Sequence, residues 1–231
     1  MEIIAEIGQN FNGDINLAIQ LIARAKENGA DVAKFQLYNA KELFSKYNNP
    51  WYEYNCKTEL TYDNVKKLKQ ACDDVNIEFM ASAFDTERVD WLESIGVKRH
   101  KLASRSINND VLINKVLQTN KQTLVSLGMW KDAEFPEINS KNIKFLHCIS
   151  KYPTPLKDVN LDQINFEKYF GFSDHTVGIT ASCAALSRGA RVVEKHFTLD
   201  KEMHGPDHIC SMSPNELLQL STYRDELKLC L

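Results

Sequence analysis

The sequence predicts a (β/α)8 TIM barrel, a fold of the α/β class. Eight strand-like runs are each followed by a crossover segment, which is the order that a barrel of parallel strands requires. The competing fold is an open doubly wound sheet, but the first predicted strand is followed by Gly8-Gln9-Asn10-Phe11-Asn12-Gly13, which is not a GxGxxG phosphate turn. A chain of 231 residues that is 43% hydrophobic can form one core, so we expect a single domain over residues 1–231.

The first half of the chain alternates strands with amphipathic helices. Asp14 is a predicted N-cap, and the helix that it begins stops at Asn28-Gly29. Residues Asn39–Thr61 form a long connection with Trp51, Tyr52 and Tyr54, and connections of this length are usually lids or binding loops. The other expected elements are strands over Glu2–Gly8, Asp31–Tyr38, Glu78–Phe84 and His100–Ser104, and helices over Tyr62–Val75, Thr86–Ile95 and Asn109–Gln118.

The second half continues the alternation with less regular crossovers. Residues Met129–Asn142 contain Pro136 and little helical periodicity, so we expect an irregular segment there. Ser213 and Pro214 predict the N-cap and first turn of the closing helix. The other expected elements are strands over Thr123–Gly128, Ile143–Ile149, Tyr169–Ser173 and Val192–Phe197, at most a short helix over Asn160–Phe166, and helices over Val177–Arg188 and Asn215–Cys230.

Composition argues against several classes of partner. The net charge is −3 and there is no block of Lys or Arg, so we expect neither a nucleic-acid partner nor a membrane surface. The six cysteines form no CxxC pair and lie mostly in apolar helical or strand contexts, which is typical of reduced core thiols. The chain enters a strand at Ile3 without a signal peptide, and no apolar run reaches membrane-spanning length. These features predict a cytoplasmic protein.

Two histidines follow strand-like runs and predict a metal site. His175 and His196 lie at the ends of two strands joined by the helix over Val177–Arg188, and parallel strands in such a unit end at the same rim. Two neutral imidazoles suit Mn, Fe, Zn or Co and leave positions open for water and substrate. The alternative for each histidine is a hydrogen-bonded residue of the core or rim.

Other polar residues also fall at strand ends, where the active site of a barrel lies. Lys34 and Lys101 stand within apolar strands, and a buried lysine requires an anionic partner. An ion pair with Glu6 or Glu194 would satisfy either one. Two lysines beside several serines fit a bound phosphate and carboxylate better. The polar residues at these strand ends are Glu6, Asn10, Lys34, Gln36, Ser82, Lys101, Ser104, Ser126, Ser150, Tyr152, Ser173, His175, Glu194 and His196.

Several short motifs resemble, in order along the chain, those of the sialic acid synthase family, whose members make N-acetylneuraminate, legionaminate and pseudaminate. The motifs are Ala5-Glu6-Ile7-Gly8-Gln9-Asn10, Val32-Ala33-Lys34-Phe35-Gln36, Cys148 with Tyr152-Pro153-Thr154-Pro155, Gly171-Phe172-Ser173-Asp174-His175-Thr176, Glu194-Lys195-His196-Phe197-Thr198, and Gly205-Pro206-Asp207 with Cys210-Ser211-Met212. The resemblance implies a barrel enzyme that condenses phosphoenolpyruvate with an N-acylated aldose, such as a compound like N-acetylmannosamine or its phosphate, and releases phosphate.

The resemblance also implies roles for individual residues. His175 and His196 match the family's metal ligands, with Mn²⁺ the first choice and Mg, Co or Fe the alternatives. Glu6 is the candidate proton-transferring group, with an ion pair to Lys34 or Lys101 as its structural alternative. Gln36, Tyr152 and Asp207 match positions that line the sugar and reaction centre. The residues that match the phosphoenolpyruvate site are Lys34, Ser82, Lys101, Ser104, Ser126 and Ser173.

The sequence also departs from the family pattern. Phe11 replaces a histidine, Ser106 a carboxylate and Ser150 an asparagine, and the family's antifreeze-like domain would lie beyond Leu231. We therefore expect a catalytic barrel without that domain, working as a homodimer or beside a separate antifreeze-like domain protein that completes the aldose site. The alternatives are a catalytically weakened sugar- or phosphoenolpyruvate-binding subunit, and a synthase of another keto-sugar acid.

Overall fold

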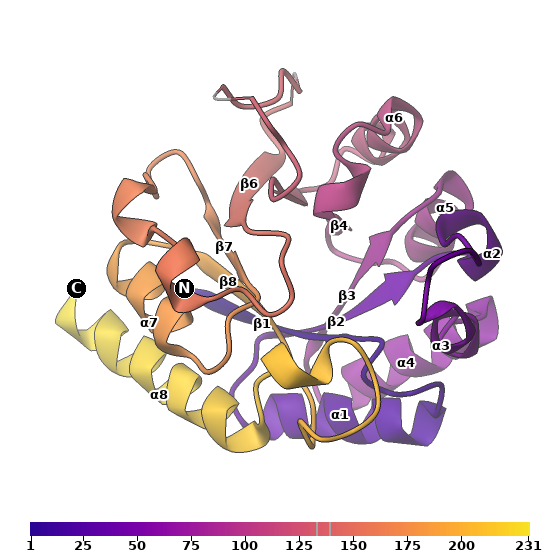
Figure 1. Ribbon diagram of the computed structural model, residues 1–231, viewed down its shortest axis with the longest axis horizontal. Helices are drawn as coiled ribbons and strands as arrows, with labels where there is room; N and C mark the ends of the chain where they lie inside the picture. Colours follow the sequence, from indigo (N-terminus) through magenta and orange to yellow (C-terminus); the bar gives the residue numbers. More distant parts are fainter. Residues whose placement is uncertain (133, 139) are drawn as a thin grey trace.

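The computed structural model, which describes residues 1–132, 134–138 and 140–231, is a closed barrel of eight parallel strands (Figure 1). Each strand pairs with the next along the chain, and β8 returns to β1. The predicted fold is thus confirmed. The strands are β1 (Glu2–Gly8), β2 (Val32–Leu37), β3 (Glu78–Ala83), β4 (His100–Leu102), β5 (Thr123–Ser126), β6 (Ile143–Cys148), β7 (Gly171–Asp174) and β8 (Val192–His196).

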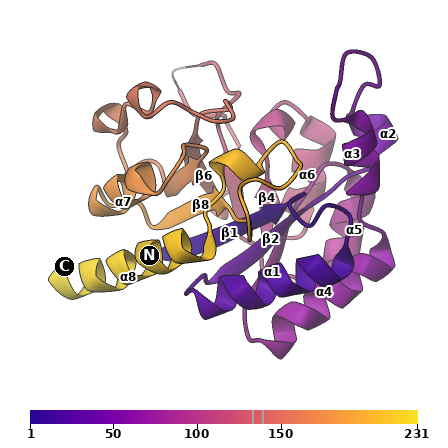
Figure 2. The same cartoon turned by 60° about the horizontal axis from the view of Figure 1, so that its bottom comes forward.

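Helices surround the strands in the order in which they follow them (Figures 1 and 2). Apolar side chains at helical spacing, such as Leu21, Ile22 and Ala25, lie on the buried face of the first helix. The helices are α1 (Ile15–Glu27), α2 (Ala40–Leu43), α3 (Tyr52–Lys57), α4 (Tyr62–Asp74), α5 (Thr86–Ser94), α6 (Asp110–Gln118), α7 (Thr180–Ser187) and α8 (Pro214–Cys230), with single 3₁₀ turns η1 (Ser104–Ser106), η2 (Leu156–Asp158), η3 (Leu161–Gln163) and η4 (His208–Cys210).

The predicted caps are present at both ends of the chain. The Asp14 carboxylate accepts a hydrogen bond from the Asn16 backbone N–H at 2.8 Å. At α8 the Ser213 hydroxyl accepts from the Glu216 backbone N–H at 3.3 Å, and the Glu216 carboxylate accepts from the Ser213 N–H at 2.8 Å. These short-range contacts define where the first and last helices begin.

Two sequence predictions need refinement, and a third is confirmed for the described residues. The long connection contains the two short helices α2 and α3 rather than a continuous loop, because Asn39 caps the first of them. The fourth strand ends at Leu102, since the chain turns into η1 from Ser104 onward. Between β5 and β6, the described residues of the crossover contain no helix, as expected for a segment with Pro136. No helix of the described chain is long and apolar enough to cross a membrane.

The barrel interior has an apolar layer beneath a polar one. Six buried apolar residues fill the interior on the side nearer the amino ends of the strands. Each comes from a different strand: Ile4, Val32, Met80, Leu124, Leu146 and Val192. Because side chains alternate along a strand, the residue two positions further on faces the same interior. Those residues are Glu6, Lys34, Ser82, Ser126, Cys148 and Glu194. The strand period alone therefore places a polar cluster at the carboxyl ends of the strands, above a hydrophobic floor.

Candidate active site

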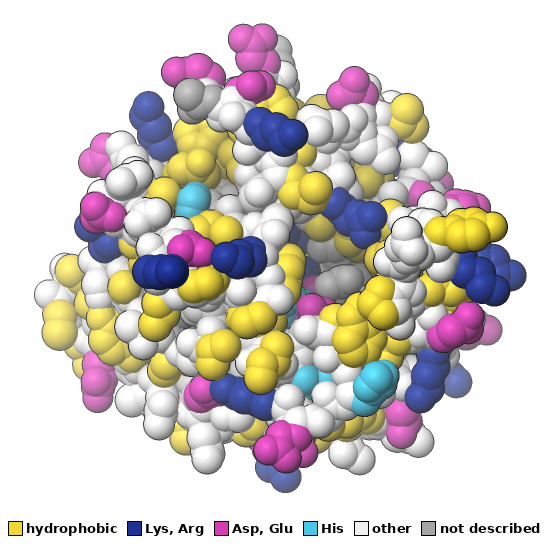
Figure 3. Space-filling model, viewed as in Figure 1, with side chains coloured by type: hydrophobic (Ala, Val, Ile, Leu, Met, Phe, Trp, Pro, Cys, Tyr) yellow, Lys and Arg dark blue, Asp and Glu magenta, His cyan; other side chains and the backbone are white. Residues whose placement is uncertain are grey.

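The polar layer lines a cavity at the carboxyl ends of the strands. The open space is about 420 Å³. Eleven of the predicted site residues line it, and Asp207 lines the adjoining outer cavity. The space-filling view shows this face hollowed near its centre, with basic, acidic and histidine side chains around the hollow (Figure 3). The barrel therefore brings together all twelve residues predicted from the sequence.

Strand register sets which of these residues meet. Glu6 lies level with Lys34 on one neighbouring strand and with His196 on the other. On the neighbouring strands β3 and β4, Ser82 is level with Lys101. Because neighbouring strands are in hydrogen-bonding contact, residues at the same level lie side by side, and the cavity wall is an almost continuous ring of polar side chains.

Two buried lysines and two buried carboxylates form the centre of this ring. Lys34 Nζ lies 2.6 Å from Glu6 Oε2 and 3.6 Å from Glu194 Oε2, and it donates to Ser82 Oγ at 3.2 Å. Lys101 Nζ donates to Ser126 Oγ at 2.8 Å and lies 3.5 Å from Glu194 Oε1. The ion-pair alternative for the lysines is therefore present. It does not exclude anion binding, because both lysines also face the cavity.

The two carboxylates have opposite pKa shifts. Burial raises the pKa of Glu6 to about 7, although Lys34 beside it acts in the opposite direction. Burial would also raise the pKa of Glu194, but Lys101 and Lys34 together hold it at about 2. Near neutral pH, Glu194 is a permanent anion, whereas Glu6 exchanges its proton.

The lysines also differ from one another. Burial would lower the pKa of Lys34, but Glu194 and Glu6 raise it above its usual value. Burial lowers the pKa of Lys101, because its single carboxylate partner compensates less than the two beside Lys34 do. Lys101 is thus the less fully neutralised cation, and a bound anion would stabilise its charge.

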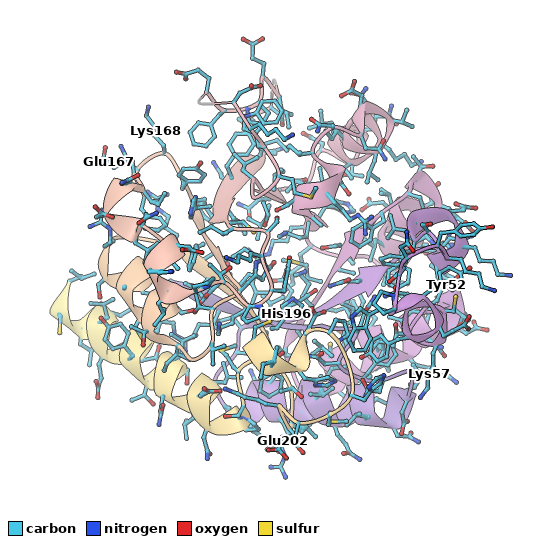
Figure 4. The ribbon with its side chains drawn as sticks, in the orientation of Figure 1. Tyr52, Lys57, Glu167, Lys168, His196 and Glu202 are labelled. Carbon is cyan, nitrogen blue, oxygen red and sulfur yellow. The ribbon has the colours of Figure 1, made fainter. Side chains whose placement is uncertain are left out.

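The two histidines lie on the opposite side of the cavity from β4. Their ring centroids are 5.9 Å apart, and the Tyr152 ring packs on His175 at 4.0 Å. His175 Nδ1 lies 2.8 Å from the Ile149 backbone carbonyl, which accepts its proton and leaves Nε2 as the free lone pair. In Figure 4, His196 lies near the middle of the barrel, whereas Tyr52, Lys57 and Glu202 lie toward the periphery.

The histidine pair has the chemistry that a divalent metal requires. Burial lowers the pKa of His196 to about 4, so this ring is neutral at physiological pH, and its buried Nδ1 has no hydrogen-bond partner among the described residues. Burial would lower the pKa of His175 too, but Cys148 raises it. A backbone carbonyl that orients one ring nitrogen is a usual feature of histidine ligands.

A metal ion here would have few protein ligands. No group of three or more His, Cys, Asp and Glu side chains within the described residues is arranged to hold an ion. The pair fits an ion that completes its coordination with water or substrate, as the sequence predicts.

The SDHT sequence places His175 through its aspartate. Asp174 is fully buried, and it accepts hydrogen bonds from the Thr176 backbone N–H at 2.8 Å and the Ser182 hydroxyl at 2.5 Å. Lys195 Nζ lies 3.2 Å from the same carboxylate and donates to the Thr176 carbonyl at 2.6 Å. This fully buried pair fixes the chain around His175 and also borders the inner cavity.

The predicted sugar-binding residues lie where the inner cavity opens into the larger outer one, which has about 1570 Å³ of open space. Gln36 and Tyr152 line both cavities. Asp207 lies in the loop after β8, where its backbone carbonyl accepts from Ser211 Oγ at 2.7 Å. Asn10 Nδ2 donates to the same Ser211 oxygen at 2.9 Å, so the CSM sequence ties the Asp207 loop to the end of β1.

The long connection after β2, predicted to be a lid or binding loop, is in contact with the loop after β8. The Trp51 ring lies 5.2 Å from the His204 ring, and the Tyr54 hydroxyl donates to the Gln9 carbonyl at 2.8 Å. Trp51 lines the outer cavity, but Tyr52 and Tyr54 do not. The long connection after β2 thus reaches the outer cavity through Trp51, whereas Tyr54 anchors this connection to the end of β1.

Cys148 is a site residue that the sequence interpretation missed. It lines the inner cavity, with Sγ 3.9 Å from His175 Nδ1, and the Ser104 hydroxyl donates to that sulfur at 3.5 Å. Cys148 is a buried free thiol, as expected for most of the six cysteines, but its side chain also borders the cavity. Its position two residues after Leu146 on an inward-facing strand was the signal that would have found it.

The departures from the family pattern differ in their consequences. Phe11 is 1% exposed and packs against Phe35, with ring centroids 6.4 Å apart, so it belongs to the hydrophobic core. Ser106 is buried and lines neither cavity. Ser150 lines the outer cavity, where a change of side chain alters what a ligand meets.

Comparison with known proteins identifies related sequences. The NeuB family model matches residues 21–230. The N,N'-diacetyllegionaminic acid synthase of Campylobacter jejuni is 40% identical over 247 aligned residues, which cover 95% of this chain and 74% of that protein. The human N-acetylneuraminate-9-phosphate synthase is 36% identical, with 94% of this chain and 67% of that protein covered.

Solved structures agree with these relatives. The N-acetylneuraminic acid synthetase of Leptospira borgpetersenii, solved in complex with citrate, superposes with a TM-score of 0.91 and is 32% identical, covering 99% of this chain and 84% of that one. A truncated 3-deoxy-D-arabino-heptulosonate 7-phosphate synthase of Thermotoga maritima has a TM-score of 0.73 at 15% identity, with 100% of this chain and 87% of that one covered, a likeness of fold alone.

Proposed function

This chain belongs to the NeuB family, and on that premise we propose that it condenses phosphoenolpyruvate with an N-acylated aldose to give a nonulosonic acid and phosphate. The observation that carries the proposal is the pair of buried lysines beneath an open cavity, each in contact with a serine hydroxyl. A phosphate and a carboxylate on one small molecule match two cations with directional hydroxyl donors.

Lys34, Lys101 and the serines Ser82, Ser104, Ser126 and Ser173 are the proposed phosphoenolpyruvate site. Ser173 Oγ donates to Glu194 Oε1 at 3.0 Å, so the Glu194 carboxylate holds both this hydroxyl and the two lysines in place. The substrate's anionic groups would enter a preorganised set of donors, which lowers the cost of ordering side chains on binding.

His175 and His196 are the proposed ligands of a divalent metal, with Mn²⁺ the first choice. A metal bound there would act as a Lewis acid on the oxygen of the open-chain aldehyde. Gln36, Tyr152 and Asp207 line the space beside these histidines and are the proposed contacts of the aldose. Tyr152 contacts His175 directly, so it would also restrict the ring's orientation.

Glu6 is the proposed proton-transferring group. In the reaction, the enol carbon of phosphoenolpyruvate forms a bond to the aldehyde carbon, whose oxygen becomes an alkoxide. Water then attacks the cationic carbon that bears the phosphate, and Glu6 takes the proton of this water and passes it to the alkoxide. The C–O bond to phosphate breaks last, as the new hydroxyl becomes the keto group and its proton leaves with the phosphate. A carboxyl group with a pKa of about 7 can accept and return this proton near neutral pH.

The test is phosphate release from phosphoenolpyruvate with Mn²⁺ and a panel of N-acyl aldoses, phosphorylated and not. The proposal requires release that depends on both an aldose and the metal. Absence of release with every aldose would contradict it. His175→Ala and His196→Ala should each remove bound metal while the barrel stays folded, as measured by metal analysis and circular dichroism. A homodimer, or a separate antifreeze-like domain protein as partner, stays a prediction of the family resemblance.

A further inference from the structure

The outer cavity continues the inner one. Six residues line both, among them Gln36, Ser104, Tyr152 and His196. A ligand whose reactive end lies beside the histidines can therefore extend into the outer space without leaving the protein surface. The residues that line only the outer cavity are candidates for contacts with the far end of such a ligand.

The outer cavity carries an excess of positive charge. Arg105 and Lys131 line it, and Asp207 is the one carboxylate among the described residues that do so. Throughout the described part of the chain, neither cation has a carboxylate within the 4.0 Å of an ion pair. Lys34 and Lys101 in the inner cavity differ from these two cations, because both lysines have carboxylate partners. Two cations without partners beside an open cavity leave a favourable position for an anion.

Arg105 is exposed, but two contacts direct its guanidinium. Its guanidinium lies over the Phe44 ring, 5.2 Å from the centroid, and Nη2 donates to the Leu43 carbonyl at 3.4 Å. That is the one hydrogen bond that the described structure gives to this side chain. Most of its N–H groups remain available, and a guanidinium binds phosphate or carboxylate through two parallel N–H groups.

Barrel topology gives the direction of the ligand. Arg105 follows β4 and Lys131 follows β5, whereas His175 and Asp207 follow β7 and β8. In a closed ring of eight strands, β4 lies across the barrel from β8. A ligand whose aldehyde lies beside the histidines would point its opposite end toward Arg105 and Lys131.

We propose that the aldose substrate carries an anionic group, a phosphate ester or a carboxylate, at the end of its chain away from the aldehyde, and that Arg105 and Lys131 bind this group. The inference rests on the proposed function and names the class of its second substrate. Phosphate and carboxylate share the chemistry that the two cations recognise, so the experiment compares both with a neutral sugar.

The experiment is calorimetric titration of the full chain with three ligands: an N-acyl hexosamine, its 6-phosphate and the corresponding 6-carboxylate. Saturating phosphoenolpyruvate and a chelator are present, so that the inner lysines are occupied and turnover is prevented. We expect the better anionic ligand to bind at least about tenfold more tightly than the neutral sugar. Arg105→Gln should reduce this ratio about tenfold, and Lys131→Gln about threefold, because both side chains are partly in water.

Lys151→Gln is the matched control. Lys151 precedes Tyr152 and is exposed, but its Nζ pairs with Asp158 Oδ2 at 3.0 Å, so its removal should leave the ratio unchanged. Equal binding of the neutral and anionic aldoses, failure of all three to bind, or an equal loss for both kinds of aldose in Arg105→Gln would overturn the inference.

Turnover separates this inference from the proposed function. Phosphate release that is best with a neutral aldose would leave the synthase proposal standing and reject the anionic substrate. Preferential binding of an anionic aldose without phosphate release from any of the three would support the anion site and contradict the synthase.

Discussion

At the scale of single residues, the environment rather than the residue type decides chemical behaviour. Glu6 and Glu194 are both buried carboxyl groups in contact with Lys34. Their pKa values nevertheless lie near 7 and near 2, because Glu194 also interacts with Lys101 and accepts a hydrogen bond from Ser173. Two carboxylates with separated pKa values are typical of sites in which one group moves a proton and the other holds a charge.

The Glu6 pKa predicts a pH dependence of activity. If Glu6 accepts the proton of the attacking water, kcat/KM should rise as pH increases through about 7. Glu6→Gln should remove this rise and lower kcat by roughly 100- to 10,000-fold. Steady-state kinetics between pH 5.5 and 8.5 are the measurement, and an unchanged rise in the variant would assign the ionisation to another group.

The raised pKa of Glu6 also predicts how the stability of the fold changes with pH. The folded-state pKa of Glu6 lies above the model value of 4.5, so its contribution to stability is present at low pH and is lost as pH rises through about 7. Glu6→Gln should therefore not unfold the protein at pH 8, where the native carboxylate is at its least favourable. Thermal melting at this pH provides the folding control for the kinetic experiment.

Lys101→Met tests the inner anion site. The variant keeps most of the side-chain volume and removes a charge that contacts Ser126 and Glu194, so phosphoenolpyruvate binding should weaken by about 1.5–3 kcal/mol. Calorimetry measures this loss. As a contrast, Lys195→Met removes half of a fully buried ion pair with Asp174, and its main effect should be on thermal stability. Unfolding of Lys101→Met without a selective loss of binding would make Lys101 a structural residue.

At the scale of elements, one end of the barrel carries the candidate site and the other end contributes to stability. The carboxyl ends of the strands carry the cavity, while the amino ends are held together by charge. Arg99 precedes β4, and it donates to Glu78 at 2.8 Å and to both carboxylate oxygens of Glu2 at 2.8 and 3.1 Å. One guanidinium thus connects the start of β4 to the starts of β1 and β3. Polar contacts at this end of a barrel usually serve stability.

Arg99→Met should therefore destabilise the fold without changing the reaction. The side chain is 10% exposed and both carboxylates are more accessible, so we expect a loss of about 2 kcal/mol, less than for a fully buried pair. Urea denaturation measures the loss. Arg24→Met, which breaks an exposed pair with Glu27 on α1, should cost less than about 0.5 kcal/mol. Equal costs for the two variants would argue against the bridging role of Arg99.

At the scale of the whole molecule, the mouth of the site is formed by segments far apart in sequence. The Trp51 and Tyr54 region contacts the loop around His204, about 150 residues later. Thr198 Oγ1 lies 2.8 Å from His208 Nδ1, and His208 Nε2 lies 3.2 Å from Asn12 Oδ1, which joins the same loop to the segment after β1. Three βα loops therefore hold one side of the outer cavity.

Gly205 is a position where the loop after β8 closely approaches the segment after β2. A Cβ atom there would lie 2.7 Å from both the Tyr54 hydroxyl and His208 Cδ2, and Gly205 has a φ of +157° that a residue with a side chain rarely adopts, so Gly205→Ala should shift these side chains and the loop that carries Asp207. We expect aldose binding to weaken about tenfold, since a small misplacement of binding groups is costly, while phosphoenolpyruvate binding stays nearly unchanged. Gly96→Ala is a control for the alanine substitution, because its Cβ would meet nothing within 4 Å. Parallel losses for both substrates in Gly205→Ala would contradict a local role.

The sequence by itself determined the alternation of eight strands and their crossovers, the caps at Asp14 and Ser213, and eleven polar site residues at strand ends that line the inner cavity, whereas Asp207 was found through the family resemblance alone. The alternation, the caps and the strand-end residues are encoded locally. Hydrophobic periodicity and capping residues act within a few positions, and a parallel barrel necessarily brings its strand ends to one rim.

Only the tertiary structure decided which of those residues touch. Strand register set Glu6 beside Lys34 and left Glu194 between both lysines, and loop packing turned Trp51 toward the cavity and Tyr54 away from it. Arg105 became a residue of the outer cavity for the same reason. These outcomes depend on contacts between segments distant in sequence, whose geometry is fixed by the packing of the whole barrel rather than by the pattern of any one segment.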